Sequence, residues 1–409
     1  MCFFRLSRIL LVLILCTLSC TGTTDANTQS GINNLNNVET ELPNLVVGAE
    51  NTFAYFSLLK GKRVALVANH TSRINEIHLV DSLISADINV VKVFAPEHGF
   101  RGKASAGEKV NDEIDAKTGI AIQSLYGKNK KPTKESLTDI DIMVFDIQDV
   151  GVRFYTYIST LHYIMEACAE SNIPLVVLDR PNPHAHYIDG PLMEDEFKSF
   201  VGMHNVPVVY GLTIAEYAHM INGEAWLANE LQCDLTTVLC MNYDRNQHYE
   251  IPIKPSPNLP NALSIQLYPS LCFFEGTTIS AGRGTDHPFQ CFGHPDMKGD
   301  FSFTPKSNEG AKNPKFKGEP ITGKDLTKLD LNEIYAHGTI DLSWILYAYA
   351  NVDNAKEMFF LENNFFEKLA GTKNLRKQIK TGISEKEIKK TWEDDLVDYQ
   401  KIRSKYLKY

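Results

Sequence analysis

The amino-acid sequence predicts an α/β fold, namely a Rossmann-like, doubly wound parallel sheet followed by a second, smaller C-terminal α+β domain. Two patterns support this prediction. Short, nearly continuous apolar runs are typical of strands that helices cover on both faces, and they lie at 63–70, 90–98, 139–149 and 173–182. Amphipathic segments separate them. In the segment before the last run, apolar residues recur at steps of four and three, on one helical face: Phe154, Ile158, Leu161, Met165 and Cys168.

The remaining elements follow in chain order. A helix is expected at 76–86, between the first two strands. The segment 213–226 predicts another helix, because Thr213 can cap its start and Glu216, three residues later, completes a capping box. The run at 234–241 predicts a further strand. The regular alternation of apolar strands and amphipathic helices ends some distance after the fourth apolar run, at about residue 205. The second domain is expected to begin there.

The N-terminus has the layout of a signal peptide. Arg5 and Arg8 precede an apolar run at 9–18, which is too short to span a bilayer as a helix. Cys20 follows Ser19 and resembles the lipidated cysteine of a lipoprotein signal, although a threonine stands where such signals usually have leucine. The alternative is an ordinary secreted protein with a chance cysteine.

These features divide the chain into four expected regions. They are a lipoprotein signal peptide at 1–20, a polar flexible tether at 21–42, the Rossmann-like domain at 43–205, and an ancillary domain at 206–409 that closes the cleft. The sequence thus predicts an exported protein of the cell envelope, anchored to a periplasmic or outer membrane face through lipid only. It gives no indication of the oligomeric state.

Composition excludes several classes of function. The net charge is −9 and the isoelectric point about 5.8, which argues against a nucleic acid partner. Five cysteines lie beyond the signal segment, an odd number without a CxxC pair, so neither a disulfide scaffold nor a zinc ribbon is expected. No GxGxxG or GxxxxGK[ST] motif follows a predicted strand, and we expect no nucleotide cofactor.

Polar and ionisable residues follow all four apolar runs. In open parallel sheets, ligands bind beyond the carboxyl ends of the strands. The residues at these ends are Asn69 with His70, Glu97 with His98, Asp146 through Asp149, and Asp179 with Arg180. This convergence predicts a functional cleft. The same histidines and aspartates could form a metal cluster, but they lack HxH or HExxH spacing, and no metal is expected.

Glu97 is the strongest candidate for chemistry. A carboxyl group at the mouth of an apolar strand can have a raised pKa, which suits a general acid at neutral pH. His98 could orient this group or contact the substrate. The alternative is a salt bridge within the turn, between Glu97 and Arg101.

Two further strand ends supply candidates with alternative structural roles. Asp146 could be catalytic, and structural hydrogen bonding is an equally good explanation. Asp149 could bind substrate or cap the following helix. Arg153 could bind a carboxylate in a bidentate manner. Arg180 and Asn182 lie in a stiff turn set by two prolines. They could recognise hydroxyl groups, or the turn could be held by an internal pair of Arg180 with Asp179.

The Pro- and Gly-rich stretch at 255–295 is too long for an ordinary connection, and its aromatic content argues against disorder. Within it, Glu275 is the natural second carboxyl group beside Glu97. Arg283 and Asp286 lie nearby in a glycine-rich loop that allows close backbone approach to a ligand. Hydrogen bonds that anchor the loop are the alternative explanation for Glu275.

Several motifs together resemble a known family. The stretches "APEHGFRG", "FDIQDVGVRFYTYISTL", "LDRPNP", "YGLTIAEYA", "PSPNLP" and "EGTTISAGRGTDHPFQ" occur in the order seen in exo-β-N-acetylmuramidases of the NamZ type, glycoside hydrolase family 171. The resemblance covers roughly 45–405. It departs from the family before "PSPN", where many members carry a tryptophan and this chain has "IPIK".

The resemblance implies an enzyme that releases β-1,4-linked N-acetylmuramic acid from the non-reducing end of peptidoglycan fragments. It also implies a cleft between a Rossmann-like and a smaller C-terminal domain, with the glutamate of "PEHG", Glu97, as the acid. Asp146 or Glu275 would be its partner. Either two carboxylates act directly, or the substrate's own acetamido carbonyl serves as the nucleophile.

The muramic acid residue carries a lactyl carboxylate, for which arginines are suitable partners. The candidates are Arg101, Arg153, Arg180 and Arg283. Tyr155, Tyr157 or Phe274 could pack on the sugar ring. The full set of expected substrate-binding residues is Asn69, His70, His98, Arg101, Asp149, Arg153, Tyr155, Arg180, Asn182, Arg283 and Asp286. Two other functions stay open: a lipoprotein that binds muropeptides without cleaving them, and a metal-dependent carbohydrate deacetylase.

Overall fold

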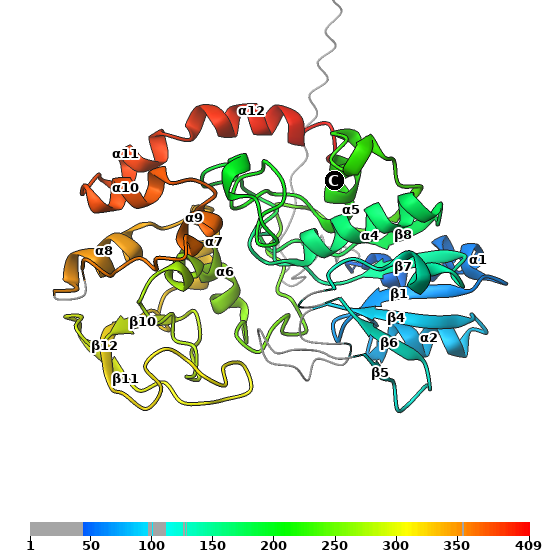
Figure 1. The fold of residues 1–409 in the computed structure, drawn as a ribbon, viewed down its shortest axis with the longest axis horizontal. Coiled ribbons are helices and arrows are strands. Elements are labelled where there is room, and N and C mark those ends of the chain that lie inside the picture. The colour runs from blue at the N-terminus through cyan, green and yellow to red at the C-terminus, as the bar shows by residue number, and fades with distance from the viewer. Residues whose placement is uncertain (1–43, 97–99, 101–111, 126, 128, 354–355) are drawn as a thin grey trace, which may run out of the picture. The chain divides into compact units, whose positions relative to one another are not determined.

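The computed structural model describes residues 44–96, 100, 112–125, 127, 129–353 and 356–409. Its larger sheet has seven strands in the order β5-β6-β4-β1-β7-β8-β9. Strands β7, β1, β4 and β6 lie side by side in Figure 1. The strands are β1 (Val64–Ala68), β4 (Val90–Ala95), β5 (Glu113–Ile114), β6 (Ala121–Ser124), β7 (Ile142–Asp146), β8 (Leu175–Leu178) and β9 (Leu235–Val238).

The sheet is parallel except for the short edge strand β5, which pairs antiparallel with β6. Counted in chain order, the six parallel strands are arranged 3-2-1-4-5-6, which is the strand order of Rossmann folds. The order reverses between β1 and β7. This confirms the predicted fold class, and it places the reversal beside Asn69 and Asp146.

The two faces of the sheet contribute to two separate hydrophobic clusters. Within β1, Ala65 and Val67 belong to one cluster, while Val64, Leu66 and Ala68 belong to the other. This alternation follows from the pleat of a strand. Because both faces are covered, every residue of β1 is buried, which explains the continuous apolar runs in the sequence.

The sheet domain has five described helices, of which α2, α4 and α5 correspond to helices that the sequence predicts. The five are α1 (Phe56–Leu59), α2 (Leu79–Ser85), α3 (Lys134–Leu137), α4 (Tyr157–Ser171) and α5 (Ile214–Gly223). The capping box of α5 is confirmed, since Thr213 accepts from the Glu216 amide and the Glu216 carboxylate accepts from the Thr213 amide at 2.9 Å. The expected helix at 76–86 starts later, because the chain first forms a small hairpin of β2 (Arg73–Ile74) and β3 (Ile77–His78).

The predicted boundary at residue 205 is too early. Strand β9 pairs in parallel with β8, so the sheet extends to Val238. The run at 234–241 was expected in the second domain, because an apolar strand does not reveal its pairing partner. Helix α5 packs against β8 and β9 and belongs to the same unit.

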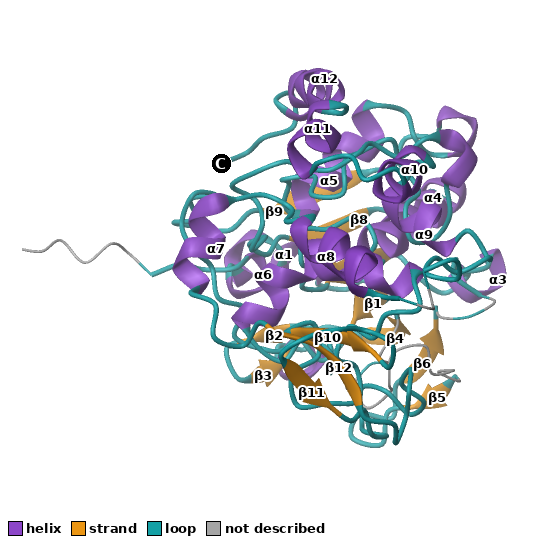
Figure 2. Ribbon diagram, turned by 90° about the vertical axis from the view of Figure 1, so that its left-hand side faces the viewer, coloured by secondary structure: helices purple, strands orange, loops and turns teal. Residues whose placement is uncertain are grey.

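The C-terminal region contains a three-stranded antiparallel sheet in the order β10-β12-β11, drawn in orange in Figure 2. Its strands are β10 (Cys291–His294), β11 (Phe301–Phe303) and β12 (Ile321–Asp325). Its helices are α6 (Ala262–Leu271), α7 (Leu331–His337), α8 (Ser343–Asn351), α9 (Phe365–Ala370), α10 (Asn374–Lys380), α11 (Glu385–Lys390) and α12 (Glu393–Arg403). This region shares one hydrophobic cluster with α4 and α5.

Short 3-10 turns complete the secondary structure: η1 (Gly48–Glu50), η2 (Thr52–Ala54), η3 (Asp195–Phe197), η4 (Ala228–Glu230) and η5 (Cys272–Gly276). The last of these carries Glu275. Within the described part of the chain, no helix combines the length and apolar character that crossing a bilayer requires.

Candidate active site

The point where the strand order reverses is bridged by hydrogen bonds. The Ser72 hydroxyl, just after β1, donates to the backbone carbonyl of Asp146 at the end of β7. The Gln148 amide donates to the Thr71 hydroxyl at 3.1 Å. Asn69 is fully buried and its side chain accepts from Thr71 and donates to the Tyr157 hydroxyl at 2.9 Å. These bonds tie the segments after β1 and β7 to each other and to α4.

Asp146 and Arg180 form a buried ion pair. The Arg180 Nε donates to Oδ1 at 2.6 Å and its Nη2 to Oδ2 at 3.0 Å. Burial lowers the pKa of Arg180, but the charge and hydrogen bonds of Asp146 more than offset this, so the pKa is raised. Both side chains are nearly inaccessible to solvent. Of the two explanations for Asp146, structural hydrogen bonding is the one that its geometry supports, and Arg180 lines neither of the two cavities described below.

Arg153 occupies a different place from the one expected. Its guanidinium is fully buried and donates only to backbone carbonyls: those of Pro191 at 3.0 Å, Val206 at 2.5 Å, Leu369 at 3.0 Å and Ala370 at 2.8 Å. The last two lie at the C-terminal end of α9, where a positive charge is favourable. Arg153 therefore fastens α9 to the sheet domain, and its position leaves no room for a substrate carboxylate.

Asp149 is also an internal residue. It accepts from the Tyr210 hydroxyl and, at 2.7 Å, from the Gly151 amide. Burial raises its pKa to about 6. These contacts hold the turn that precedes α4, and Asp149 does not cap this helix, whose N-cap residue is Thr156.

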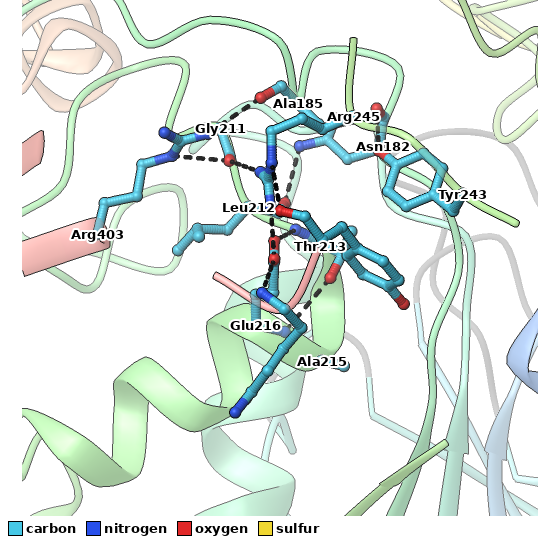
Figure 3. A network of polar contacts seen from close by, with 12 residues as sticks. Asn182, Ala185, Gly211, Leu212, Thr213, Ala215, Glu216, Tyr243, Arg245 and Arg403 are labelled. Atoms are coloured by element: carbon cyan, nitrogen blue, oxygen red, sulfur yellow. Dashed lines mark hydrogen bonds and ion pairs between the residues drawn. The ribbon is translucent and has the colours of Figure 1, made fainter. Parts of the chain in front are cut away.

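Asp179 and Asn182 make polar contacts at the end of β8, and Figure 3 shows those of Asn182. Asn182 donates to the Leu212 carbonyl at 2.8 Å and accepts from the His184 amide at 2.7 Å. Asp179 accepts from the Ala215 amide at 2.9 Å and from the Tyr409 hydroxyl at 2.6 Å. The predicted recognition of hydroxyl groups by Asn182 finds no support in these contacts.

The polar contacts in Figure 3 join distant parts of the chain. Arg245 pairs with the fully buried Glu216 at 2.6 Å and also donates to the Gly211 carbonyl at 3.3 Å. Arg403, at the end of α12, donates to Gly211 at 2.9 Å and to Ala185 at 3.1 Å. This edge of the sheet therefore serves to hold α12 in place.

A cavity of about 520 Å³ lies where the sheet domain meets the C-terminal region. We call it the wide cavity. Its walls come from the segment before α4, from the chain around residue 200, from η5 and its following loop, and from α9. The lining residues are Gly127, Lys130, Phe154, Thr156, Phe200, Val201, Tyr268, Cys272, Glu275, Arg283, Phe365 and Leu369.

Glu275 and Arg283 form an ion pair on the wall of the wide cavity. The Arg283 Nε donates to Glu275 at 3.0 Å, and each side chain is about a quarter exposed. The guanidinium lies over the Phe289 ring, 4.9 Å from its centroid. Burial raises the pKa of Glu275, but the charges of Arg283 and Lys315 more than offset this, so the pKa is lowered and the group is ionised at neutral pH. An ionised carboxylate can act as a base or nucleophile and cannot donate a proton.

A second cavity, of about 70 Å³, adjoins the wide cavity. We call it the side cavity. The two share Phe154, Thr156, Tyr268 and Arg283 as lining residues. The side cavity is otherwise lined by Tyr155, Tyr157, Ser256, Asn258, Leu259 and Phe289. The Tyr155 hydroxyl donates to the Pro255 carbonyl at 2.8 Å, which holds the segment 255–259 against the start of α4.

Two of the remaining candidates, His70 and Asp286, belong to the described residues. His70 is half-buried and its Nε2 lies 2.8 Å from the Lys254 carbonyl, beside the segment that forms the side cavity. Asp286 is exposed and lines neither cavity. Glu97, His98, Arg101 and Cys20 lie outside the described residues. Among the described residues no group of three or more metal-ligating side chains comes together.

Sequence reasoning thus found Tyr155, Glu275 and Arg283 and missed most of the remaining lining. Tyr268, Asn258 and Leu259 carry no charge, and the search for ionisable groups passed over them. The one available signal was the long Pro- and Gly-rich stretch, which contains all three.

Comparisons with known proteins identify relatives over nearly the whole described chain. The family model described as "Exo-beta-N-acetylmuramidase NamZ, N-terminal" matches residues 64–263, and its C-terminal counterpart matches 266–409. The peptidoglycan beta-N-acetylmuramidase NamZ of Bacillus subtilis (strain 168) is 39% identical over 383 residues, covering 87% of this chain and 89% of that protein.

Two solved structures are similar, both of DUF1343 family proteins from Bacteroides fragilis NCTC 9343. One is 45% identical, with a TM-score of 0.83 over 90% of this chain and 99% of that one. The other is 31% identical, with a TM-score of 0.74 over 89% of this chain and 99% of that one. The junction between the two family models falls at the start of α6, so the N-terminal model includes the whole seven-stranded sheet.

Proposed function

The chain belongs to the exo-β-N-acetylmuramidase NamZ family, and from this we propose that it cleaves muramic acid from peptidoglycan fragments. It is a glycoside hydrolase that acts from the end of its substrate. The observation that carries this conclusion is the match of both family models, which together span all residues that line the two cavities.

The wide cavity supports this function. Ligand pockets typically measure about 300–1,000 Å³, and a volume of about 520 Å³ is within this range. Aromatic side chains such as Phe154, Phe200 and Tyr268 offer apolar surfaces to sugar rings. The ion pair of Glu275 and Arg283 supplies the charged groups. A site built from aromatic walls and a few polar groups is suited to an anionic sugar.

Arg283 is our candidate for the residue that binds the lactyl carboxylate. Among contacts within the described chain, its side-chain hydrogen bond comes from Nε, and Arg283 lines both cavities. Glu275 and the Phe289 ring hold the guanidinium from two sides. An arginine fixed in this way is preorganised for a bidentate bond to a carboxylate.

Glu97 is our candidate for the general acid. In the sequence it follows Pro96 directly after β4, the strand that pairs with β1. Its proton would pass to the glycosidic oxygen as the bond to the anomeric carbon breaks. Glu275, ionised at neutral pH, is the better candidate for its partner than Asp146, which Arg180 neutralises inside the protein.

A chromogenic β-N-acetylmuraminide tests the function. Purified protein should release the chromophore with saturation kinetics. A lipoprotein that only binds muropeptides would show saturable affinity without release. A metal-dependent deacetylase would release acetate instead, and it would lose activity when a chelator is added.

The place of the protein in the cell is a separate proposal. Arg5, Arg8, the apolar run at 9–18 and the Ser19–Cys20 pair support an exported lipoprotein, held to a membrane of the cell envelope through lipid on Cys20. Mass spectrometry of the mature N-terminus tests it. A lipidated Cys20 would support the anchor, whereas a free N-terminus after cleavage at another position would contradict it.

A further inference from the structure

We infer that the side cavity is the binding site for the N-acyl group of the terminal sugar and that its size selects acetyl over longer acyl groups. This inference rests on the proposed function. It assigns separate places to the two substituents that distinguish muramic acid: the acetamido group enters the side cavity, and the lactyl group stays in the wide cavity, with Arg283 between them.

The volume of the side cavity supports this assignment. An apolar cavity of about 150 Å³ admits benzene, which has six heavy atoms. In the same proportion, a cavity of about 70 Å³ admits about three heavy atoms. The acyl part of an acetamido group has three, namely the carbonyl carbon, its oxygen and the methyl carbon. A propionyl group has one more.

The lining of the side cavity has the chemistry that an acetamido group needs. Leu259 and Phe289 are almost fully buried and offer an apolar wall to the methyl group. Ser256 and Thr156 present hydroxyl groups, and Arg283 presents its guanidinium, as donors for the carbonyl oxygen. A site that combines an apolar wall with a few polar groups is suited to an amide with a short alkyl chain.

The position of the side cavity also fits the sugar's geometry. It shares four lining residues with the wide cavity, so a ring in the wide cavity can extend one substituent into it. Tyr157 connects it to Asn69 at the carboxyl end of β1 through the 2.9 Å hydrogen bond. The acyl group would therefore lie near the carboxyl end of β1.

The rigidity of the wall makes the size limit sharp. Leu259 donates its backbone amide to the Ser256 carbonyl at 3.0 Å, and Asn258 donates its side chain to the Gly310 carbonyl at 2.7 Å. Asn258 is itself almost fully buried. The wall therefore cannot yield easily, and an added methylene in such a pocket typically costs about 10- to 200-fold in kcat/KM.

The test compares two chromogenic muraminides that differ only in the acyl group, N-acetyl and N-propionyl. With the wild-type protein we expect kcat/KM to be at least about 10-fold lower for the propionyl substrate. The variant Leu259→Ala enlarges the side cavity and should reduce this ratio at least about 10-fold. Because the ratio is measured on one preparation, the fraction of folded protein cancels. Leu259→Val, which removes a single methylene, gives a smaller shift in the same direction if the alanine variant does not fold.

Val201→Ala is the matched control, because Val201 lines only the wide cavity. Its ratio of propionyl to acetyl turnover should equal that of the wild type. Equal turnover of both substrates by the wild type, or equal shifts in the Leu259 and Val201 variants, would overturn the assignment. So would a Leu259 variant that changes only the preference for muraminides over glucosaminides, since that result would place the lactyl group in the side cavity.

A binding measurement separates this inference from the proposed function. Calorimetry with N-acetylmuramic acid and its N-propionyl analogue reports the same discrimination without turnover. Weaker binding of the propionyl sugar that Leu259→Ala relieves would support the side cavity assignment even if no glycoside were cleaved. Equal affinities in the wild type would contradict it, whatever the activity.

Discussion

Arg180 donates to both carboxylate oxygens of Asp146, at 2.6 and 3.0 Å, and so joins the ends of β8 and β7 inside the protein. Two residues that the sequence places at the mouth of a cleft thus neutralise each other inside the protein. Neither of them lines the wide cavity or the side cavity, whereas Glu275 and Arg283 form an ion pair on the wall of the wide cavity.

Asp146→Asn should destabilise the protein severely. The substitution leaves the charge of Arg180 buried without its counterion, which typically costs about 3–5 kcal/mol. Denaturant unfolding measures the change. Asp139→Asn is the control, because Asp139 makes a similar 3.0 Å contact to Arg63 at the surface, where such pairs contribute about 1 kcal/mol or less. If both variants lost equally little stability, Asp146 would not have the structural role assigned to it.

Arg283→Met should remove the preference for muramic acid. We expect the ratio of kcat/KM for a β-N-acetylmuraminide to that for a β-N-acetylglucosaminide to fall at least about 10-fold, since a charge-assisted hydrogen bond to the lactyl carboxylate is lost. Lys130→Met removes a positive charge from the same cavity and should leave the ratio unchanged. A shift in the Lys130 variant alone would transfer the role to that residue.

Glu97→Gln should abolish turnover without unfolding the protein. General acid catalysis typically contributes about 10²- to 10⁴-fold, and an amide cannot supply the proton. The measurement is kcat on the chromogenic muraminide, accompanied by the midpoint of thermal unfolding. Glu76→Gln, at an exposed position, is the isosteric control. Activity close to that of the wild type would remove Glu97 from the role of acid.

Asp179 should make stability depend on pH. Burial raises its pKa from 3.8 to about 7. The folded protein therefore keeps a proton that the unfolded chain releases. The contribution of Asp179 to the free energy of unfolding is full below pH 3.8 and is lost as the pH rises through 7. Relative to Asp179→Asn, the wild type should lose up to about 4 kcal/mol of unfolding free energy between pH 4 and 8.

Asp141 provides a comparison of opposite sign. Hydrogen bonds from Arg63 lower the pKa of Asp141 to about 2. Its contribution to the free energy of unfolding is therefore present above pH 3.8 and is lost as the pH falls through 2. Asp141→Asn should thus be less stable than the wild type at neutral pH and approach it in acid. Unfolding curves at several pH values measure both variants. A pH-independent difference between wild type and Asp179→Asn would contradict the buried, protonated state of Asp179.

The fold could be predicted because its signals are local. Continuous apolar runs identified β1, β4, β7 and β8, and the capping box of Thr213 and Glu216 identified the start of α5. Strand pairing is not local. Strand β9 was recognised as a strand, but its partner β8 lies about sixty residues earlier, and no feature of either segment specifies their contact.

The site could be predicted only in part, for a related reason. A charged residue at a strand end has the same appearance in a sequence whether it faces a ligand or an internal partner. Asp146 and Arg153 are satisfied inside the protein, by Arg180 and by four backbone carbonyls, because a buried charge is costly without such partners. Glu275 and Arg283 also pair, but their partial exposure keeps them available at the wide cavity.

Product analysis of a disaccharide with N-acetylmuramic acid β-1,4-linked at its non-reducing end tests the proposed function most directly. Mass spectrometry should detect free N-acetylmuramic acid and free N-acetylglucosamine in equal amounts, and a tetrasaccharide should lose only its terminal muramic acid first. An intact disaccharide, under conditions in which calorimetry shows that it is bound, would contradict the assignment of this protein as a muramidase.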